Sequence, residues 1–193
     1  MAGKKKKESW EWIKALVIAV AIAAIVRGIF FAPIVVSGPS MQPTFFTGDR
    51  LVVSKQSTPD RFDIIVFNHN EPQEDGSTQE KEYIKRVIGL PGDTVEYKND
   101  VLYVNGKAYK ETYLNDYRSK YEKEKKANFT LDFTLFEVTQ PHVKKVPKGE
   151  LFVLGDNRQR SSDSRTFGTI KQSDIVGKAL FRFWPFSKIS TID

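Results

Sequence analysis

Residues 83–93 read YIKRVIGLPGD, a run of large apolar residues around two cations that ends in glycine and proline. β-Branched residues favour strands, and the closing glycines and proline are typical of a turn. Successive side chains of a strand point to opposite faces. The stretch therefore predicts a strand that turns Lys85 and Arg86 to opposite sides, with Lys85 set among apolar neighbours.

The same strand signal recurs along the chain beyond residue 32. Short β-branched or aromatic runs alternate with turns, and Asn105-Gly106 favours a tight type I′ turn. No segment beyond residue 31 shows a long helical period. We therefore expect a mainly β protein whose antiparallel domain is a coiled sheet or partly closed barrel. The predicted strands are 34–36, 50–53, 63–67, 94–97, 101–104, 107–109, 151–154 and 178–183.

Two segments read as less ordered than the strands. Residues 68–79 are polar and rich in turn formers, so they predict a loop. Residues 114–127 are dense in Lys, Glu, Tyr and Asn. We interpret this second segment as a solvated face or mobile loop rather than as a docking surface.

Composition excludes several kinds of chemistry. The 193 residues contain no cysteine, which removes disulfides, thiol catalysis and cysteine-ligated metals. The two histidines, His69 and His142, share no ligand spacing with acidic residues, so neither a metal nor another cofactor is expected. The net charge of +6 is compatible with an anionic membrane surface or with nucleic acid. The lysine runs of the sequence, at 4–7 and around 120–126, do not belong to a recognisable nucleic-acid-binding fold. No nucleic-acid partner is therefore expected.

Residues 12–31 predict a membrane anchor. They span about 20 residues, or roughly 30 Å as a helix, which is enough to cross the hydrocarbon core. Four lysines precede the span, and the positive-inside rule then puts residues 1–11 in the cytoplasm and residues 32–193 outside. We expect a single-pass protein of the cell membrane, in contact with the lipid bilayer, with Pro33 ending the helix.

A cleavable signal peptide is the competing interpretation of this segment. Ala21-Ile22-Ala23 has the small-x-small pattern of a cleavage site. It lies inside the apolar run with no polar region before it, and apolar character continues through Phe31. We therefore favour a retained anchor.

Ser40 and Lys85 form the one convincing nucleophile–base pair in the sequence. Ser40 lies in SGPSMQPT, residues 37–44, whose glycine and prolines predict an exposed tight turn. A serine hydroxyl is activated when a base takes its proton, and an uncharged lysine can be that base. Burial among apolar side chains lowers the pKa of a lysine by disfavouring the charged form. The two stretches are therefore candidates for the halves of one active site.

Five elements, in the same order, resemble the bacterial type I signal peptidases of Gram-positive organisms. They are the N-terminal anchor, the Ser40 and Lys85 segments, GDRLVV at 48–53, and GDNRQRSSDSR at 155–165. The resemblance implies a membrane-anchored serine endopeptidase that removes signal peptides from exported preproteins with a Ser-Lys dyad. It also implies a smaller inserted β region, at about 98–150.

The resemblance also assigns supporting residues. The main-chain N–H of Ser40 would help to bind the oxyanion, while Gly38 stands where some members carry a second, serine donor. Ser161 would orient the lysine ammonium. The charged residues that would hold the site in place are Asp163 with Arg165, joined by Asp156 and Arg158.

In the family, an extended substrate pairs with the segment before the serine and with the one before the lysine. Such strand addition gives affinity through backbone bonds and specificity through alternate side chains. Shallow apolar pockets would then accept small residues at the first and third positions before the cut. The corresponding residues here are Ile34, Val35, Val36, Tyr83 and Ile84.

Two alternatives belong to other classes of protein. A catalytically silent, membrane-anchored binding module of the same fold would be expected to lack the nucleophile or the base, yet Ser40 and Lys85 are both present. A self-cleaving repressor of the same Ser-Lys fold would carry a DNA-binding helix-turn-helix where this chain has a lysine run and an apolar span.

Overall fold

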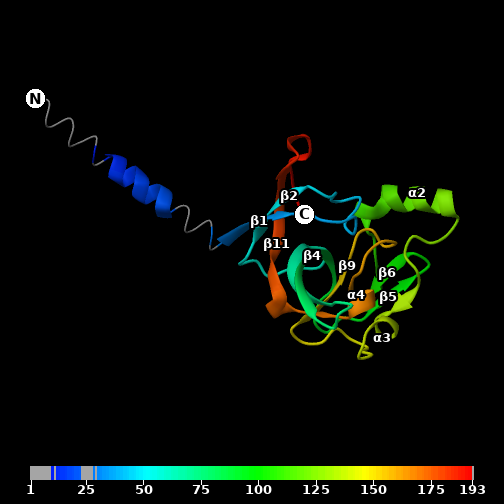
Figure 1. The fold of residues 1–193 in the computed structure, drawn as a ribbon. Helices are drawn as coiled ribbons and strands as arrows, with labels where there is room; N and C mark the ends of the chain where they lie inside the picture. Colours follow the sequence, from blue (N-terminus) through cyan, green and yellow to red (C-terminus); the bar gives the residue numbers. More distant parts are fainter. Residues whose placement is uncertain (1–9, 11, 23–27, 29, 193) are drawn as a thin grey trace, which may run out of the picture.

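The computed structural model describes residues 10, 12–22, 28 and 30–192, and residues 12–22 are helical (Figure 1). Within those ranges, no helix combines the length and hydropathy that crossing a membrane requires. Part of the predicted anchor, residues 23–27 and 29, lies outside the described residues.

Antiparallel strands are the main regular structure of the described chain, as the sequence predicts. Eight of them form one sheet, in which each strand pair is antiparallel. The order across the sheet is β1 (Phe31–Val35), β2 (Arg50–Ser54), β11 (Ile175–Trp184), β3 (Ile64–Pro72), β4 (Thr78–Gly89), β9 (Glu150–Leu154) and β10 (Ile170–Lys171), with β12 (Ser190–Thr191) paired to β11.

A second, four-stranded sheet is inserted between β4 and β9 along the chain. Its two hairpin turns place both central residues at positive φ, with Asn99 and Asp100 in one turn and Asn105 and Gly106 in the other. This is the type I′ geometry that Asn-Gly favours, because these residues tolerate the left-handed region. The strands, in order, are β7 (Lys107–Tyr109), β6 (Val101–Val104), β5 (Val95–Lys98) and β8 (Phe133–Thr134).

The hydrophobic core has three parts, and two of them lie under the candidate catalytic segments. One part joins the two sheets, where Ile88 and Phe152 of the large sheet pack with Tyr97 and Phe133 of the small one. Another surrounds Met41, which is fully buried directly after Ser40. The third packs the neighbouring strands β3, β4 and β9. The turn that carries Ser40 therefore packs directly against the hydrophobic core.

The boundary between the first helix and the first strand differs from the sequence prediction. Phe31, the expected last residue of the anchor, begins β1, and Pro33 lies inside this strand opposite Val52. Proline is tolerated there because β1 is an edge strand, where one side of the backbone needs no ladder donor.

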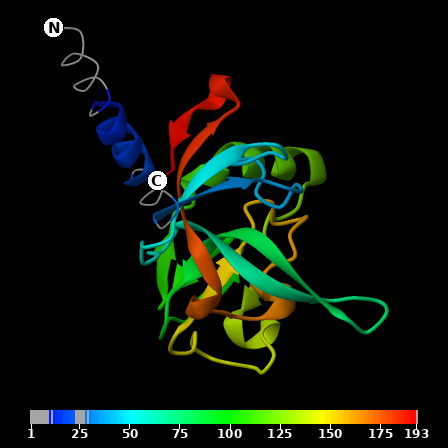
Figure 2. The same ribbon diagram turned by 60° about the vertical axis from the view of Figure 1, so that its left-hand side comes forward.

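Residues 68–72 and 78–79 form strand, and only residues 73–77 form the loop that the sequence predicts. β3 and β4 pair without interruption from Ile64 opposite Arg86 to Pro72 opposite Thr78. The outer half of this hairpin extends beyond the rest of the domain (Figure 2). Continuous cross-strand pairing has overridden the low strand propensity of the polar residues.

Residues 114–127 are mostly helical, so this segment is a solvated helical face rather than a mobile loop, the two forms that the sequence left open. α2 (Asn115–Lys125) buries none of its residues, and its C-cap residue, Lys126, adopts the left-handed conformation. Lysine, glutamate and arginine are good helix formers, which explains a helix of such polar composition. The remaining helical elements are η1 (Thr112–Leu114), α3 (Leu135–Val138), α4 (Ser164–Phe167), η2 (Gln172–Asp174) and η3 (Phe186–Lys188).

Candidate active site

Ser40 lies in a tight turn that follows β1 and is fixed by backbone hydrogen bonds. The N–H of Gln42 donates to the carbonyl of Pro39 across the turn, at 3.1 Å. The Gly155 loop, residues 155–165, holds the turn from the other side. In that loop the N–H of Asn157 donates to the carbonyl of Ser40 at 2.9 Å, and its side-chain amide donates to Pro39 at 3.1 Å. The nucleophile candidate is therefore positioned by two segments that are far apart in the sequence.

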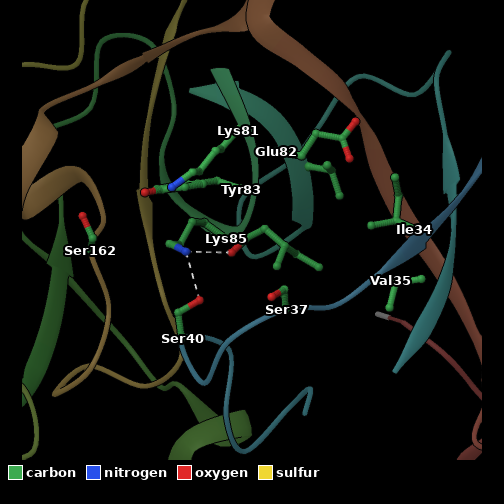
Figure 3. Close-up of a pocket in the computed structure, with 11 residues that line it drawn as sticks. Ile34, Val35, Ser37, Ser40, Lys81, Glu82, Tyr83, Lys85 and Ser162 are labelled. Carbon is green, nitrogen blue, oxygen red and sulfur yellow. Dashed lines mark hydrogen bonds between the residues drawn. The ribbon is translucent and has the colours of Figure 1, made fainter. Parts of the chain in front are cut away.

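Lys85 lies on β4 and points at Ser40, as the close-up shows (Figure 3). Its Nζ is 3.0 Å from Ser40 Oγ and 3.1 Å from the carbonyl oxygen of Ile84. The ring of Tyr83 lies 4.9 Å from the same Nζ. The two candidate side chains are thus within direct hydrogen-bond reach, the distance that proton transfer requires.

Burial gives Lys85 the acidity that a lysine base needs. Only 4% of the residue is exposed. Burial lowers its pKa from 10.5 to about 8, while the negative charges of Asp163 and Asp156 oppose that change. A lysine with this pKa is partly uncharged near neutral pH, whereas an ordinary surface lysine is not.

Arg86 points to the other side of β4 and forms a buried ion pair with Asp156. Nε donates to Oδ1 at 2.9 Å and Nη2 donates to Oδ2 at 2.7 Å. The guanidinium also donates to the carbonyl of Phe62 and stacks 3.8 Å from the ring centre of Tyr113. Thr44, four residues after the candidate nucleophile, donates its hydroxyl to Asp156. The pair therefore joins β4, the nucleophile turn and the Gly155 loop.

Asp163 and Arg165 form the expected ion pair, with Arg165 Nε 2.8 Å from Asp163 Oδ1. The other oxygen of Asp163 accepts from the N–H of Gly155 at 3.0 Å. Arg165 donates in turn to the carbonyl of Arg158 at 2.9 Å. The pair thus closes the Gly155 loop upon itself.

The side chains of Asp156 and Arg158 bind different partners, while the N–H of Arg158 donates to the carbonyl of Asp156 at 3.0 Å. Asp156 binds Arg86, whereas Arg158 Nη2 lies 2.6 Å from Glu111 Oε1, with both side chains fully buried. Burial raises the pKa of Glu111, but Arg158 and the neighbouring hydrogen bonds outweigh burial and hold it below its usual value. Glu111 comes from the inserted region and belongs to no recognisable motif, so sequence reasoning missed it.

Ser161 makes no hydrogen bond to Lys85. Its Oγ is buried and has no hydrogen-bond partner among the described residues. A Cβ added at Gly155 would lie 2.1 Å from this Oγ and 2.6 Å from the carbonyl oxygen of Ser40. Ser161 therefore packs against the glycine that lets the loop approach the nucleophile turn, and the orienting contact expected for it is absent.

A groove of about 420 Å³ runs past the two candidate catalytic side chains. β1 and β4 are not neighbours in the sheet, yet both line it, so the sheet curls to bring them face to face (Figure 3). Val36 is buried in the core and does not line the groove. The other predicted substrate-binding residues, Ile34, Val35, Tyr83 and Ile84, line the groove together with Ser37, Ser40, Val66, Lys81, Glu82, Lys85 and Ser162.

Comparisons with known proteins agree with the resemblance. The family described as "Signal peptidase, peptidase S26" matches residues 9–184. The chain belongs to this family, and within it to the bacterial type I signal peptidases; it is a peptidase and therefore a hydrolase.

Relatives match over nearly the whole chain. A signal peptidase I of Bacillus caldolyticus is 46% identical, covering 97% of this chain and 96% of that protein. A signal peptidase IB of Staphylococcus aureus (strain Mu50) is 42% identical, covering 95% and 93%. The crystal structure of a signal peptidase I from Enterococcus faecalis V583 superposes with a TM-score of 0.53 at 45% identity, covering 63% of this chain and 97% of that one.

Proposed function

We propose that this peptidase cleaves signal peptides from exported preproteins, with Ser40 as nucleophile and Lys85 as general base. The observation that carries the proposal is the 3.0 Å hydrogen bond between Lys85 Nζ and Ser40 Oγ in a buried setting. It is supported by family membership and by the pKa of Lys85, which is lowered to about 8.

The reaction follows the general course of acyl transfer. Uncharged Lys85 takes the proton of Ser40 as Oγ attacks the scissile carbonyl carbon. The oxyanion that forms is bound by main-chain donors, among them the N–H of Ser40. Protonated Lys85 gives its proton to the leaving amine, and the peptide bond breaks. A water molecule that Lys85 activates then hydrolyses the ester and frees Ser40.

The groove between β1 and β4 supports an extended substrate. One edge of β1 is unpaired, so a peptide can add to it through backbone hydrogen bonds. Ile34, Val35 and Ile84 give this groove a shallow apolar lining next to the nucleophile. Such a lining suits small side chains at the first and third positions before the cut.

The test is cleavage of a purified preprotein by the full chain in detergent. We expect cleavage at the signal-peptide junction and loss of at least three orders of magnitude in rate for Ser40→Ala and for Lys85→Met. Ser173→Ala and Lys123→Met, at exposed sites away from the groove, are the matched controls and should cleave normally. A preprotein that binds but stays intact with the native chain would instead favour the silent binding module.

We also propose that residues 12–31 anchor the enzyme in the membrane, with residues 1–11 in the cytoplasm and the catalytic domain outside. The aliphatic side chains of residues 16–18, 20 and 22 are more than half exposed, as lipid-facing residues would be. Trp184 and Phe186 are exposed aromatic residues of the kind that favour a membrane interface. An anchored enzyme shares a two-dimensional phase with its substrate, which raises their effective concentration.

Because the sequence contains no cysteine, a single cysteine introduced by mutation is the only thiol available for labelling and reports on which side of the membrane it lies. Single-cysteine variants Lys4→Cys and Ser57→Cys in intact cells should differ in labelling by a membrane-impermeant maleimide. We expect Ser57→Cys to react without lysis and Lys4→Cys to react only after lysis. Equal labelling of both variants in intact cells would contradict the orientation.

A further inference from the structure

A second cavity, of about 330 Å³, lies beside the nucleophile turn. Two short stretches of chain lead from the groove into it. Ser40 lines the groove and Gln42 the cavity, just as Ser162 lines the groove and Arg160 the cavity. Two residues of backbone span at most about 7 Å, so the Cα atoms of Ser40 and Gln42, which line the groove and the cavity respectively, lie within that distance of each other.

The position of this cavity suits the part of a substrate that follows the cut. The groove between β1 and β4 takes the residues before the scissile bond in the function proposed above. The residues after it must leave Ser40 on the other side of the turn. α2 lies beside the turn that follows β1 in both views of the fold (Figures 1 and 2), and it supplies one wall of the cavity.

The cavity has a fixed aromatic floor. Phe129 is fully buried, and Tyr117 and Tyr121, one helical turn apart on α2, meet its ring edge-on at 5.7 and 5.5 Å. The side-chain amide of Gln159 donates to the carbonyl of Phe129 at 2.5 Å. These contacts hold α2 against the Gly155 loop, so the cavity exists before any peptide arrives.

The rim of the cavity carries more positive than negative charge. Lys120, Lys125 and Arg160 are the cations, and Glu124 is the one acid among the lining residues. Lys120 lies 3.9 Å from Glu124 in an exposed pair. Lys125 and Arg160 have no ion pair or side-chain hydrogen bond with any described residue, so two cations are left to face an incoming chain.

We propose that this cavity, formed by α2 and the Gly155 loop, receives the first residues of the mature protein and favours a carboxylate side chain there. An extended chain advances about 3.3 Å per residue, so the preferred position is the second or third residue after the cut. A lysine or arginine at that position meets two unpaired cations and is disfavoured. This inference rests on the proposed function and adds the part of the substrate that the groove does not contact.

The experiment uses peptides that share one signal-peptide segment and carry Glu, Gln or Lys at each of the first four positions after the cut. The ratio of kcat/KM for Glu over Gln is measured within each enzyme variant, so that a general loss of activity cancels. We expect a ratio of about five at the second or third position for the native full chain. The ratio should fall toward one in Lys125→Gln/Arg160→Gln and below one in Lys125→Glu/Arg160→Glu.

A local effect must be separated from the general attraction of a basic protein for acidic peptides. Lys123→Gln/Lys126→Gln removes the same two charges from neighbouring positions that do not line the cavity, and should keep the native ratio. Raising the salt to 0.5 M should reduce the ratio, because the charges on the rim are exposed to solvent.

Two results would overturn the inference. They are a ratio near one at all four positions in the native chain, and an unchanged ratio in the Lys125/Arg160 variants. In each case the Gln peptide is still cleaved at its junction. Failure to cleave any of the peptides would contradict the proposed function itself, so the two failures are distinguishable.

Discussion

Arg86 and Asp156 hold each other through two parallel hydrogen bonds, with 3% and 0% of their side chains exposed. Arg86 directly follows Lys85 on β4, and Asp156 directly precedes Asn157, which donates to the carbonyl of Ser40. The ion pair therefore connects the backbone of the candidate base to the loop that supports the candidate nucleophile.

Replacing Asp156 by Asn should be strongly destabilising, because it leaves the Arg86 charge buried without a negatively charged partner. We expect the free energy of unfolding to fall by about 3–5 kcal/mol, measured by urea denaturation of the full chain. Glu124→Gln breaks an exposed pair and should cost less than about 1 kcal/mol. Similar losses in the two variants would show that the buried pair contributes nothing special.

The pH dependence of cleavage should report the pKa of Lys85. Because the base must be uncharged, kcat/KM should rise about tenfold per pH unit at low pH and level off above about pH 8. The substrate should be a peptide without titratable groups near the cut, so that its own ionisation does not contribute to the pH dependence of kcat/KM. A rate that stays constant between pH 6 and pH 9 would exclude Lys85 as the base.

Removing the negative charge of Asp163 should move this profile. Asp163 raises the pKa of Lys85, so Asp163→Asn should lower it and shift the low-pH limb of kcat/KM toward lower pH. Asp174→Asn removes a half-buried carboxylate that is not among the charges shifting the pKa of Lys85, and serves as control. A shift toward higher pH in Asp163→Asn would contradict the electrostatic argument, whatever the change in maximal rate.

Lys85→Met should stabilise the protein below pH 8 while abolishing cleavage. The folded pKa of Lys85, about 8, lies below its ordinary value of 10.5, so between these values the unfolded chain binds more protons and stability rises with pH. Below pH 8 the full cost of burying the cation applies, which is on the order of 3 kcal/mol. Urea unfolding from pH 6 to pH 10 should show a flatter dependence for Lys85→Met. Parallel curves for both proteins would contradict the lowered pKa.

Gly155→Ala should disrupt the site by steric conflict alone. The new Cβ would meet Ser161 Oγ at 2.1 Å and the carbonyl oxygen of Ser40 at 2.6 Å, so the loop must move away from the nucleophile turn. We expect a rate loss of more than about a hundredfold, since misplacement by about 1 Å has such effects. Gly149→Ala, at φ +78° with open space around it, should lose stability through backbone strain but keep its activity. Equal activity of the two variants would contradict this account.

The strands and the candidate nucleophile–base pair could be predicted because their signals are local. β-Branched runs favour the extended backbone of a strand, and residues such as Asn105-Gly106 favour the left-handed backbone of a tight turn. Ser40 and Lys85 are 45 residues apart in the sequence. They could still be paired, because a serine nucleophile needs a base to take its proton and Lys85 is the candidate base. The family resemblance added the Gly155 loop, whose internal ion pair also lies within a few residues of sequence.

The partners of the buried cations could not be predicted. Arg158 binds Glu111, 47 residues away in a region without motifs, and only the packing of the two sheets brings them together. The strands at residues 68–72 and 78–79 and the helix at 115–125 were not predicted, for a related reason. Polar composition predicts exposure correctly in both, but it does not distinguish a loop from an exposed hairpin or an exposed helix.

The long strand β4 changes character along its length. Its first five residues are exposed, Tyr83 is half-buried, and Ile84 to Gly89 are buried. We expect amide hydrogen exchange in the outer half to require only local opening of the hairpin, and exchange in the inner half to require unfolding of the whole domain. Tyr83 and Ile84 line the groove at the boundary between these two halves. Under the proposed function, one wall of the groove would then be rigid at Lys85 and more easily displaced a few residues further out, so that varied sequences before the cut fit without displacing the base.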